Sequence, residues 1–316
     1  MPINIYCSPL RYPGGKRKLS SFIQLIIEEN RLQGRHYVEP YCGGAAVGLA
    51  LLFGELADEI HINDLSRSVY AFWHSVLHEA EALCKKILCT SVNTKEWKRQ
   101  REIQEGEDAS LLELGFSTFF LNRVNRSGIL KGGLIGGKKQ DGAWKLDARF
   151  NREDLVRRIR KIVRYSDRIH IYNMDASAFL SDVYPDLPPT FTYLDPPYYT
   201  KGDALYANWY EDDDHKMVAA QVRELEHEWL VSYDCVPRII QLYHPYRSLR
   251  YSVSYSAHRR FRGREIMFFS EGLTVPFVED WRSAPERASK QHWKVGGIRF
   301  SMGGEAQVPI CVHNDT

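Results

Sequence analysis

Short apolar runs alternate with amphipathic stretches through residues 1–66 and again through 166–271, which we take as one interrupted domain. A short run of β-branched, aromatic and aliphatic residues is typical of a buried strand, whereas apolar residues at helical spacing indicate a helix. The patterns predict strands at 36–40, 59–63, 168–172, 191–194 and 229–233, and helices at 20–29, 45–52, 176–182, 212–228 and 236–243. Strands that alternate with helices form a mainly parallel sheet with helices on both faces. We therefore expect an α/β fold with a Rossmann-like sheet.

The pattern changes between residues 67 and 165, where helical runs and polar loops replace the strands. We expect helices at 69–88 and 111–121 in this part of the chain. A loop rich in Gly and Lys follows at 131–144, and a loop of that length is usually either functional or disordered. We interpret 67–165 as a mainly helical lobe inserted between the second and third strands of the sheet.

An arginine-rich turn near residue 260 lies between two further strand patterns, at 247–254 and 265–270. Two adjacent strands joined by a polar turn predict a hairpin. We expect this hairpin to be the last part of the sheet. The tail at 272–316 contains no motif that indicates a role.

Composition limits the class of protein without giving a function. The 316 residues are 44% hydrophobic, which is enough for a sizeable core, and the formal net charge is only +2. The six cysteines form no Cys-x-x-Cys pair and the histidines are scattered, so we expect reduced thiols and no metal site. The chain has no signal-like start, and its longest apolar stretch, 45–53, is too short to span a bilayer. A cytoplasmic protein without a membrane partner is expected.

Positive residues gather at three places, 98–101, 157–161 and 259–264. Each cluster is consistent with the solvated face of a helix or hairpin. Clusters that flank a single site indicate a polyanionic partner instead. The charge pattern alone leaves both interpretations open.

The strand predicted at 191–194 ends abruptly at the sequence Asp-Pro-Pro-Tyr, residues 195–198. Proline cannot donate to a strand ladder and restricts the residue before it, so the two prolines must end the strand. The Asp195 carboxylate and the Pro196 carbonyl then lie in an extended turn beside the ring of Tyr198. A plain strand terminator with a surface acid is the alternative interpretation.

Acidic residues follow three of the predicted strands. Asp64, Asp175 and Asp195 each stand at a strand end, and a turn of small residues at 41–46 follows the first strand. Open α/β sheets bind ligands at the carboxyl ends of their strands, where an acid about 20 residues past a glycine turn commonly holds ribose hydroxyls. Asp64 could instead cap the helix that begins near Ser66, and the two roles are not exclusive.

A second glycine turn precedes the first predicted helix, where Tyr12 and Lys16 frame Gly14 and Gly15. Such a turn allows the backbone to approach a ligand closely. A helix-start turn with a solvated lysine is the alternative, and the turn by itself does not distinguish the two.

The order of these motifs resembles that of the Dam-like class (alpha group) of S-adenosylmethionine-dependent N6-adenine DNA methyltransferases. The resemblance covers about residues 9–270, and its hallmark is the Asp-Pro-Pro-Tyr sequence. A glycine motif at 38–45 precedes the hallmark, and two later motifs lie at 232–234 and 263–265. The resemblance implies a Rossmann-like methyltransferase sheet with helices on both faces and a target-recognition lobe at 67–165.

The resemblance also implies roles for individual residues. Catalysis would be the task of Asp195, Pro196 and Tyr198. The implied cofactor-binding residues are Tyr12, Lys16, Glu39, Gly43, Asp64 and Asp175. The expected DNA-binding residues are Asn122, Arg123, Arg126, Lys131, Arg260, Arg262 and Arg264.

The implied activity is site-specific methylation of adenine N6 in double-stranded DNA, the chemistry of restriction-modification. S-adenosylmethionine would be the cofactor, S-adenosylhomocysteine its product, and no metal would be needed. A monomer or weak dimer is expected. The residues after the Asn-Arg pair at 122–123 differ from those of the best-known GATC methylases, so their target sequence does not carry over.

A duplex hides its exocyclic amines, so such an enzyme must flip the target base out. Tyr198 would stack on the flipped ring, while Asp195 and the Pro196 carbonyl accept the two N6 hydrogens and orient the nitrogen. A cytosine-N4 methyltransferase needs the same amine chemistry. A non-catalytic DNA-binding protein on the same fold is the third possibility.

Overall fold

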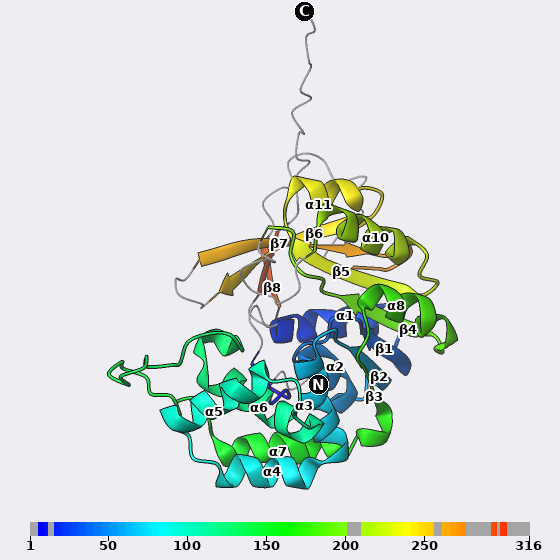
Figure 1. Ribbon diagram of the computed structural model, residues 1–316. Helices are drawn as coiled ribbons and strands as arrows, with labels where there is room; N and C mark the ends of the chain where they lie inside the picture. The colour runs from blue at the N-terminus through cyan, green and yellow to red at the C-terminus, as the bar shows by residue number, and fades with distance from the viewer. Residues whose placement is uncertain are drawn as a thin grey trace, which may run out of the picture.

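The computed structural model describes residues 6–11, 16–200, 210–255, 261–275, 292–295 and 298–301. These residues form a sheet of nine strands in the order β3-β2-β1-β4-β5-β7-β6-β9-β8 (Figure 1). The strands are β1 (Arg35–Glu39), β2 (Ala57–Asn63), β3 (Ile169–Tyr172), β4 (Thr190–Leu194), β5 (Glu228–Asp234), β6 (Arg247–Tyr255), β7 (Phe261–Phe269), β8 (His292–Val295) and β9 (Ile298–Ser301). The expectation of a Rossmann-like α/β fold is confirmed.

Strands β1 to β5 run parallel, and β7 enters antiparallel between β5 and β6. The chain moves outward from β1 through β2 to β3, then returns to β4 on the other side of β1. The strand order therefore reverses between β1 and β4, which is the place where open α/β sheets bind their ligands. We call the ends of β1, β2, β4 and β5 at this point the carboxyl edge.

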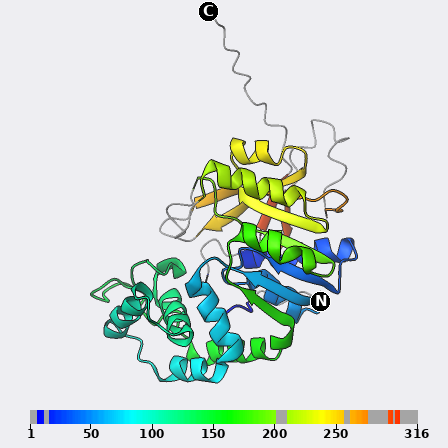
Figure 2. The ribbon, with the colours of Figure 1, turned by 45° about the vertical axis from the view of Figure 1, so that its right-hand side comes forward.

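Helices cover both faces of the sheet (Figure 2). They are η1 (Lys16–Leu19), α1 (Ser20–Glu29), α2 (Ala46–Phe53), α8 (Ala176–Asp182), η4 (Tyr184–Asp186), α10 (Asp212–Arg223) and α11 (Pro237–Leu242). Because side chains alternate between the faces of a strand, Tyr37 of β1 packs in the core with α1 and α2, whereas Val38 packs in the core with α8, α10 and α11. The helix predicted at 212–228 is shorter, because β5 already begins at Glu228.

Five helices and two short 3₁₀ turns lie between β2 and β3, in the lower part of Figure 1. They are α3 (Arg67–His78), α4 (Ala80–Cys89), α5 (Thr94–Glu105), α6 (Leu111–Val124), η2 (Arg126–Gly128), α7 (Arg152–Val163) and η3 (Ser166–Arg168). The single helix expected at 69–88 is wrong, because Glu79 leaves the helical conformation at φ −133° and separates α3 from α4.

Helices α5 and α7 were not predicted. Only Trp97 and Gln100 of α5 are buried, so its sequence has almost no apolar periodicity. Helix α7 has buried apolar residues at helical spacing, Leu155, Ile159 and Ile162, but the arginines between them make this pattern difficult to recognise.

The predicted hairpin forms, with Arg247 paired to Phe269 and Tyr255 to Phe261, but it does not end the sheet. Strands β8 and β9 from the tail continue the sheet on the β6 side, where Arg250 pairs with Ser301. The missed signal in the sequence was the Gly-Gly dipeptide at 296–297, which is typical of two-residue hairpin turns, between two short strand patterns. Among the helices that the structure describes, none is long and apolar enough to cross a membrane.

Candidate active site

Strand β4 is buried throughout and delivers Asp195 to the carboxyl edge. The Asp195 carboxylate accepts hydrogen bonds from Lys16 Nζ at 2.9 Å and from Ser232 Oγ at 2.6 Å. Lys16 begins η1 and Ser232 lies on the neighbouring strand β5, so three distant segments meet at one carboxylate. Asp195 is therefore held in place and is not a free surface acid.

Lys16 is the centre of a buried network. Its ammonium also contacts Glu265 Oε2 of β7 at 3.0 Å and the Tyr198 hydroxyl, and its side chain is 12% exposed. Glu265 is 1% exposed, and its second carboxylate oxygen has no partner among the described residues. One ammonium thus stands among two carboxylates and a phenol.

This arrangement shifts the pKa values of Lys16 and Asp195. Burial lowers the pKa of Lys16, but Asp195 and Glu265 raise it well above its ordinary value. Burial raises the pKa of Asp195 and Glu265 adds to the rise, while Lys16 and Ser232 oppose it. Lys16 is therefore a permanent cation here, and Asp195 takes up a proton more readily than an ordinary aspartate.

Tyr198 lies inside this network and is only 5% exposed. Lys16 Nζ lies 4.9 Å from the centre of its ring. Stacking of a flipped base on Tyr198 therefore requires the ring to be uncovered first. The next residue, Tyr199, is 36% exposed.

Asp234 fixes the turn that follows the Asp-Pro-Pro-Tyr sequence. Its carboxylate accepts hydrogen bonds from the backbone amides of Tyr199 and Thr200, both at 3.0 Å, and from Thr200 Oγ1 at 2.5 Å. Asp234 ends β5, so it belongs to the series of strand-end acids. Asp234 belongs to the motif at 232–234, for which the sequence indicated no individual role.

Glu39 is the last residue of β1, and Gly43 lies in the turn that follows the strand. Glu39 is buried and accepts hydrogen bonds from the Tyr37 hydroxyl at 2.9 Å and from the Gly48 amide at 3.0 Å. Burial raises the pKa of Glu39 to about 8. Gly43 has φ +47°, a left-handed conformation that glycine adopts readily.

Asp64 faces the same turn from the end of β2. Its carboxylate accepts the Gly43 amide and the Ser66 amide, each at 2.9 Å. Burial raises the pKa of Asp64 to about 6, against the effect of these two hydrogen bonds. The N-cap of α3 is Ser66, and Asp64 joins this cap to the glycine turn by accepting one amide from each.

Asp175 lies at the end of β3, close along the same edge. It is exposed and caps α8 by accepting the Ser177 amide at 2.8 Å. Asn63 ties the ends of β2 and β3 together by donating to the carbonyl of Met174 at 3.0 Å. Tyr12, the remaining residue expected at the cofactor, lies outside the described residues.

Two of the residues expected at DNA are buried in the lobe. The Asn122 side chain accepts the Arg11 amide at 2.7 Å and donates to the carbonyls of Arg11 and Gly128 at 2.6 and 2.9 Å. Arg123 is 8% exposed, and burial lowers its pKa to about 9. The structure thus uses Asn122 to fasten the N-terminal segment to the lobe, and neither side chain lies on the surface.

Three of the other DNA candidates have a described exposure. Arg126, Lys131 and Arg264 are exposed. Arg262 lies within β7, and Arg260 falls outside the described residues. The loop at 131–144 is built from turns, and Gln140 holds it by donating to the carbonyls of Ile135 and Gly137 at 2.8 and 2.7 Å.

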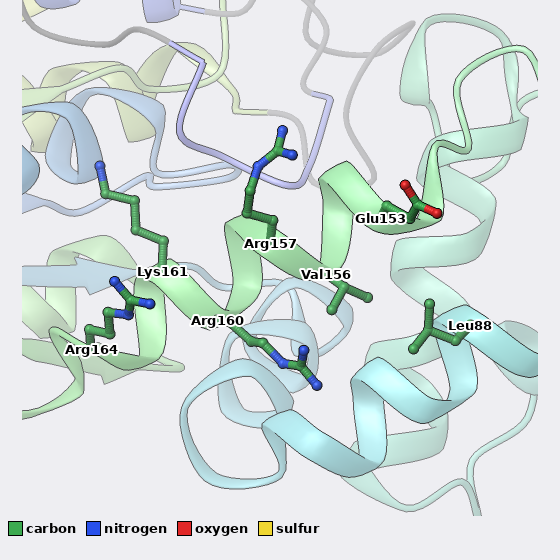
Figure 3. Close-up of a pocket in the computed structure, with 7 residues that line it drawn as sticks. All are labelled: Leu88, Glu153, Val156, Arg157, Arg160, Lys161 and Arg164. Atoms are coloured by element: carbon green, nitrogen blue, oxygen red, sulfur yellow. The ribbon is translucent and has the colours of Figure 1, made fainter.

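The basic cluster at 157–161 lines a pocket between α4 and α7 (Figure 3). Much of its charge is used within the lobe. Arg160 donates two hydrogen bonds to Glu81 of α4, at 3.1 and 2.9 Å, and Lys161 Nζ lies 4.1 Å from the centre of the Phe53 ring. The cluster fits the solvated face of a helix, and the pocket contains none of the predicted site residues.

The strand order and the acids at its carboxyl edge define a Rossmann-like methyltransferase. The family model described as D12 class N6 adenine-specific DNA methyltransferase matches residues 12–260, and the chain belongs to this family. It is accordingly an adenine-specific DNA methyltransferase, and the family implies chemistry dependent on S-adenosylmethionine. A search of curated proteins found no match.

Solved structures resemble the chain only distantly. A candidate RNA methyltransferase of Pyrococcus horikoshii is 8% identical with a TM-score of 0.42, and the alignment covers 83% of this chain and 88% of that chain. A conserved hypothetical protein of Streptococcus pyogenes is 10% identical with a TM-score of 0.30, covering 77% and 89%. A candidate methylase of Haemophilus influenzae is 8% identical with a TM-score of 0.30, covering 81% and 98%. These similarities are too weak to assign a substrate.

Proposed function

We propose that this methyltransferase flips an adenine out of double-stranded DNA and transfers a methyl group from S-adenosylmethionine to its N6 amine. The observation that carries the proposal is the fixed position of Asp195 at the strand reversal, bonded to Lys16 and Ser232. The order of the motifs, with the glycine turn before the lobe and Asp-Pro-Pro-Tyr after it, supports assignment to the Dam-like alpha group.

Asp195 and the Pro196 carbonyl supply the two acceptors that an exocyclic amine requires. Accepting both N6 hydrogens aligns the nitrogen lone pair away from the ring, which is catalysis by orientation and electrostatics. Lys16 holds the carboxylate in position through the 2.9 Å contact, so we assign Lys16 to positioning Asp195 rather than to the cofactor alone. No covalent enzyme intermediate is needed.

The polar groups at the carboxyl edge fit S-adenosylmethionine. Asp64 offers a carboxylate to the ribose hydroxyls beside the Gly43 amide, and Glu39 and Asp175 flank the same edge. When bound, S-adenosylmethionine supplies the electrophilic methyl group.

For DNA, we propose that the lobe between β2 and β3 and the β6–β7 hairpin hold the duplex. Exposed Arg126, Lys131 and Arg264 are suited to phosphate contacts. Buried Asn122 and Arg123 support this lobe from the inside of the protein. We expect the active form to be a monomer or weak dimer.

Transfer of a labelled methyl group to duplex DNA tests the function, with mass analysis of the digested nucleosides. N6-methyladenine is expected. N4-methylcytosine would replace the proposal with the related amine chemistry, and binding of duplex without any transfer would identify a non-catalytic DNA-binding protein.

Asp195→Ala should lower transfer by at least about 1,000-fold while leaving S-adenosylmethionine binding nearly unchanged, because the carboxylate acts on the amine in the transition state. Asp195→Asn keeps the shape of the side chain and should also be inactive. Asp213→Asn, which changes a carboxylate that is 91% exposed on α10, is the matched control and should retain activity. Transfer within tenfold of the unmodified protein in Asp195→Ala would overturn the role assigned to Asp195.

A further inference from the structure

Three histidines and one glutamate meet on one face of the sheet, away from the carboxyl edge. His36 lies on β1, Glu59 and His61 on β2, and His170 on β3. In the strand register, Val38 pairs with His61 and His61 with His170. The β1–β2 register shifts between Arg35 and Tyr37, so it is the side-chain contacts that place His36 and Glu59 on the same face as His61. We call these four residues the histidine cluster.

The possible ligand atoms of the cluster converge. His36 Nδ1 lies 2.9 Å from His61 Nε2 and 3.9 Å from Glu59 Oε2. One ligand atom from each of these three residues lies within 4.8 Å of the others. A tetrahedral ion with bonds of about 2.0–2.1 Å separates its ligand atoms by roughly 3.3–3.5 Å. This value lies between the distances of 2.9 and 3.9 Å given above. Small movements of the side chains would therefore allow an ion to bind.

Outer hydrogen bonds hold two of these side chains in the required orientation. His61 Nδ1 lies 3.0 Å from the Tyr172 hydroxyl, which leaves Nε2 directed at His36. His170 Nε2 lies 2.5 Å from Glu59 Oε2, and the rings of His61 and His170 stack with centres 4.5 Å apart. Histidines that bind metals nearly always bond through their second nitrogen in this manner.

We propose that His36 Nδ1, His61 Nε2 and the Glu59 carboxylate bind a divalent transition metal of the Zn²⁺ type. Imidazole nitrogen and carboxylate oxygen are ligands that Zn²⁺ accepts. His170 and Tyr172 form the outer shell. Because Glu59 is 31% exposed, water completes the coordination. The ion joins β1 to β2 and so stabilises the part of the sheet that ends in Glu39 and Asp64.

The experiment is a titration of the metal-stripped full chain with Zn²⁺ by calorimetry, and with Co²⁺ by visible absorption. We expect one tight site, a tetrahedral Co²⁺ spectrum, and a rise in melting temperature with Zn²⁺ because the ion binds only the folded form. Since the site does not include Asp195, methyl transfer by Asp195→Ala should stay lost with or without metal.

His36→Gln and Glu59→Gln are the main variants, because both side chains are partly exposed and the changes are mild. Each removes a proposed ligand and should weaken Zn²⁺ binding by at least about 10-fold, the smallest loss typical for a residue that only supports a ligand. His61→Gln should abolish it, and S-adenosylmethionine binding reports whether that variant is folded.

The matched control is His74→Gln combined with His78→Gln, a pair one turn apart on α3 with ring centres 4.6 Å apart. This pair is the obvious place for adventitious binding, and its loss should leave the tight site unchanged. Loss of binding in the α3 variant, unchanged binding in His36→Gln and Glu59→Gln, or no tight site in the unmodified chain would each overturn the proposal. The histidine cluster would then be a hydrogen-bonded ladder only.

Discussion

At the carboxyl edge, the Lys16 ammonium lies between the carboxylates of Asp195 and Glu265, whereas in the histidine cluster three imidazoles share the single carboxylate of Glu59. Both clusters belong to the same sheet. The first is built from ions that depend on each other, because each buried charge needs its partner. The second is built mainly from imidazole rings around one partly exposed carboxylate. Loss of one member should therefore have very different effects in the two clusters.

The largest change in the free energy of unfolding is expected from Lys16→Met. Removing the ammonium leaves two carboxylates buried without a cation, and breaking such a buried pair costs about 3–5 kcal/mol of unfolding free energy. Urea denaturation measures it, with Lys138→Met in the exposed loop as control. Adding Glu265→Gln to Lys16→Met should recover part of the loss. A loss of unfolding free energy below about 1 kcal/mol would show that charge interactions do not stabilise the network.

A second prediction concerns pH. Glu39 has an ordinary pKa of 4.5 that burial raises to about 8. Between these values the folded chain holds a proton that the unfolded chain has released, so Glu39 makes the protein less stable as pH rises. In Glu39→Gln this contribution disappears.

The stability of Glu39→Gln relative to the unmodified protein should therefore increase by up to about 1.4 kcal/mol per pH unit between pH 5 and 8. Urea denaturation of the cofactor-free protein at several pH values measures this. A difference that stays constant with pH would mean that Glu39 is ionised in the fold and that the carboxyl edge tolerates a further charge.

The smallest effect is expected from His170→Gln in the histidine cluster. His170 is 40% exposed and Glu59 31%, so solvent screens their interaction, and its loss should cost about 1 kcal/mol or less in the absence of metal. Denaturation of metal-free protein provides the measurement. A cost equal to that of Lys16→Met would remove the distinction between the two clusters.

Strands β1 to β7 and most helices of the sheet domain could be predicted because each buries a face, and burial leaves a periodic record in the sequence, whereas β8 and β9 were missed. Asp195, Asp64 and Asp175 could be found because strand ends of a parallel sheet share one edge. Helix α5 could not be found in this way, since it buries little beyond Trp97 and Gln100. The roles of Asn122 and Arg123 could not be predicted either, because the sequence alone does not show whether a polar side chain is buried in the protein or exposed to a partner.

The α/β class, the position of Asp-Pro-Pro-Tyr at a strand end and the glycine turn before Asp64 can be predicted without a structure, because they depend on local periodicity and on the restrictions of proline and glycine. The bond of Lys16 to Asp195, 179 positions apart, and the meeting of scattered His36, His61 and His170 in one cluster are visible only in the folded chain. Strand order and register bring such residues together. Neither is encoded in the spacing of residues along the chain, since pairing between distant strands is settled by packing of the whole sheet.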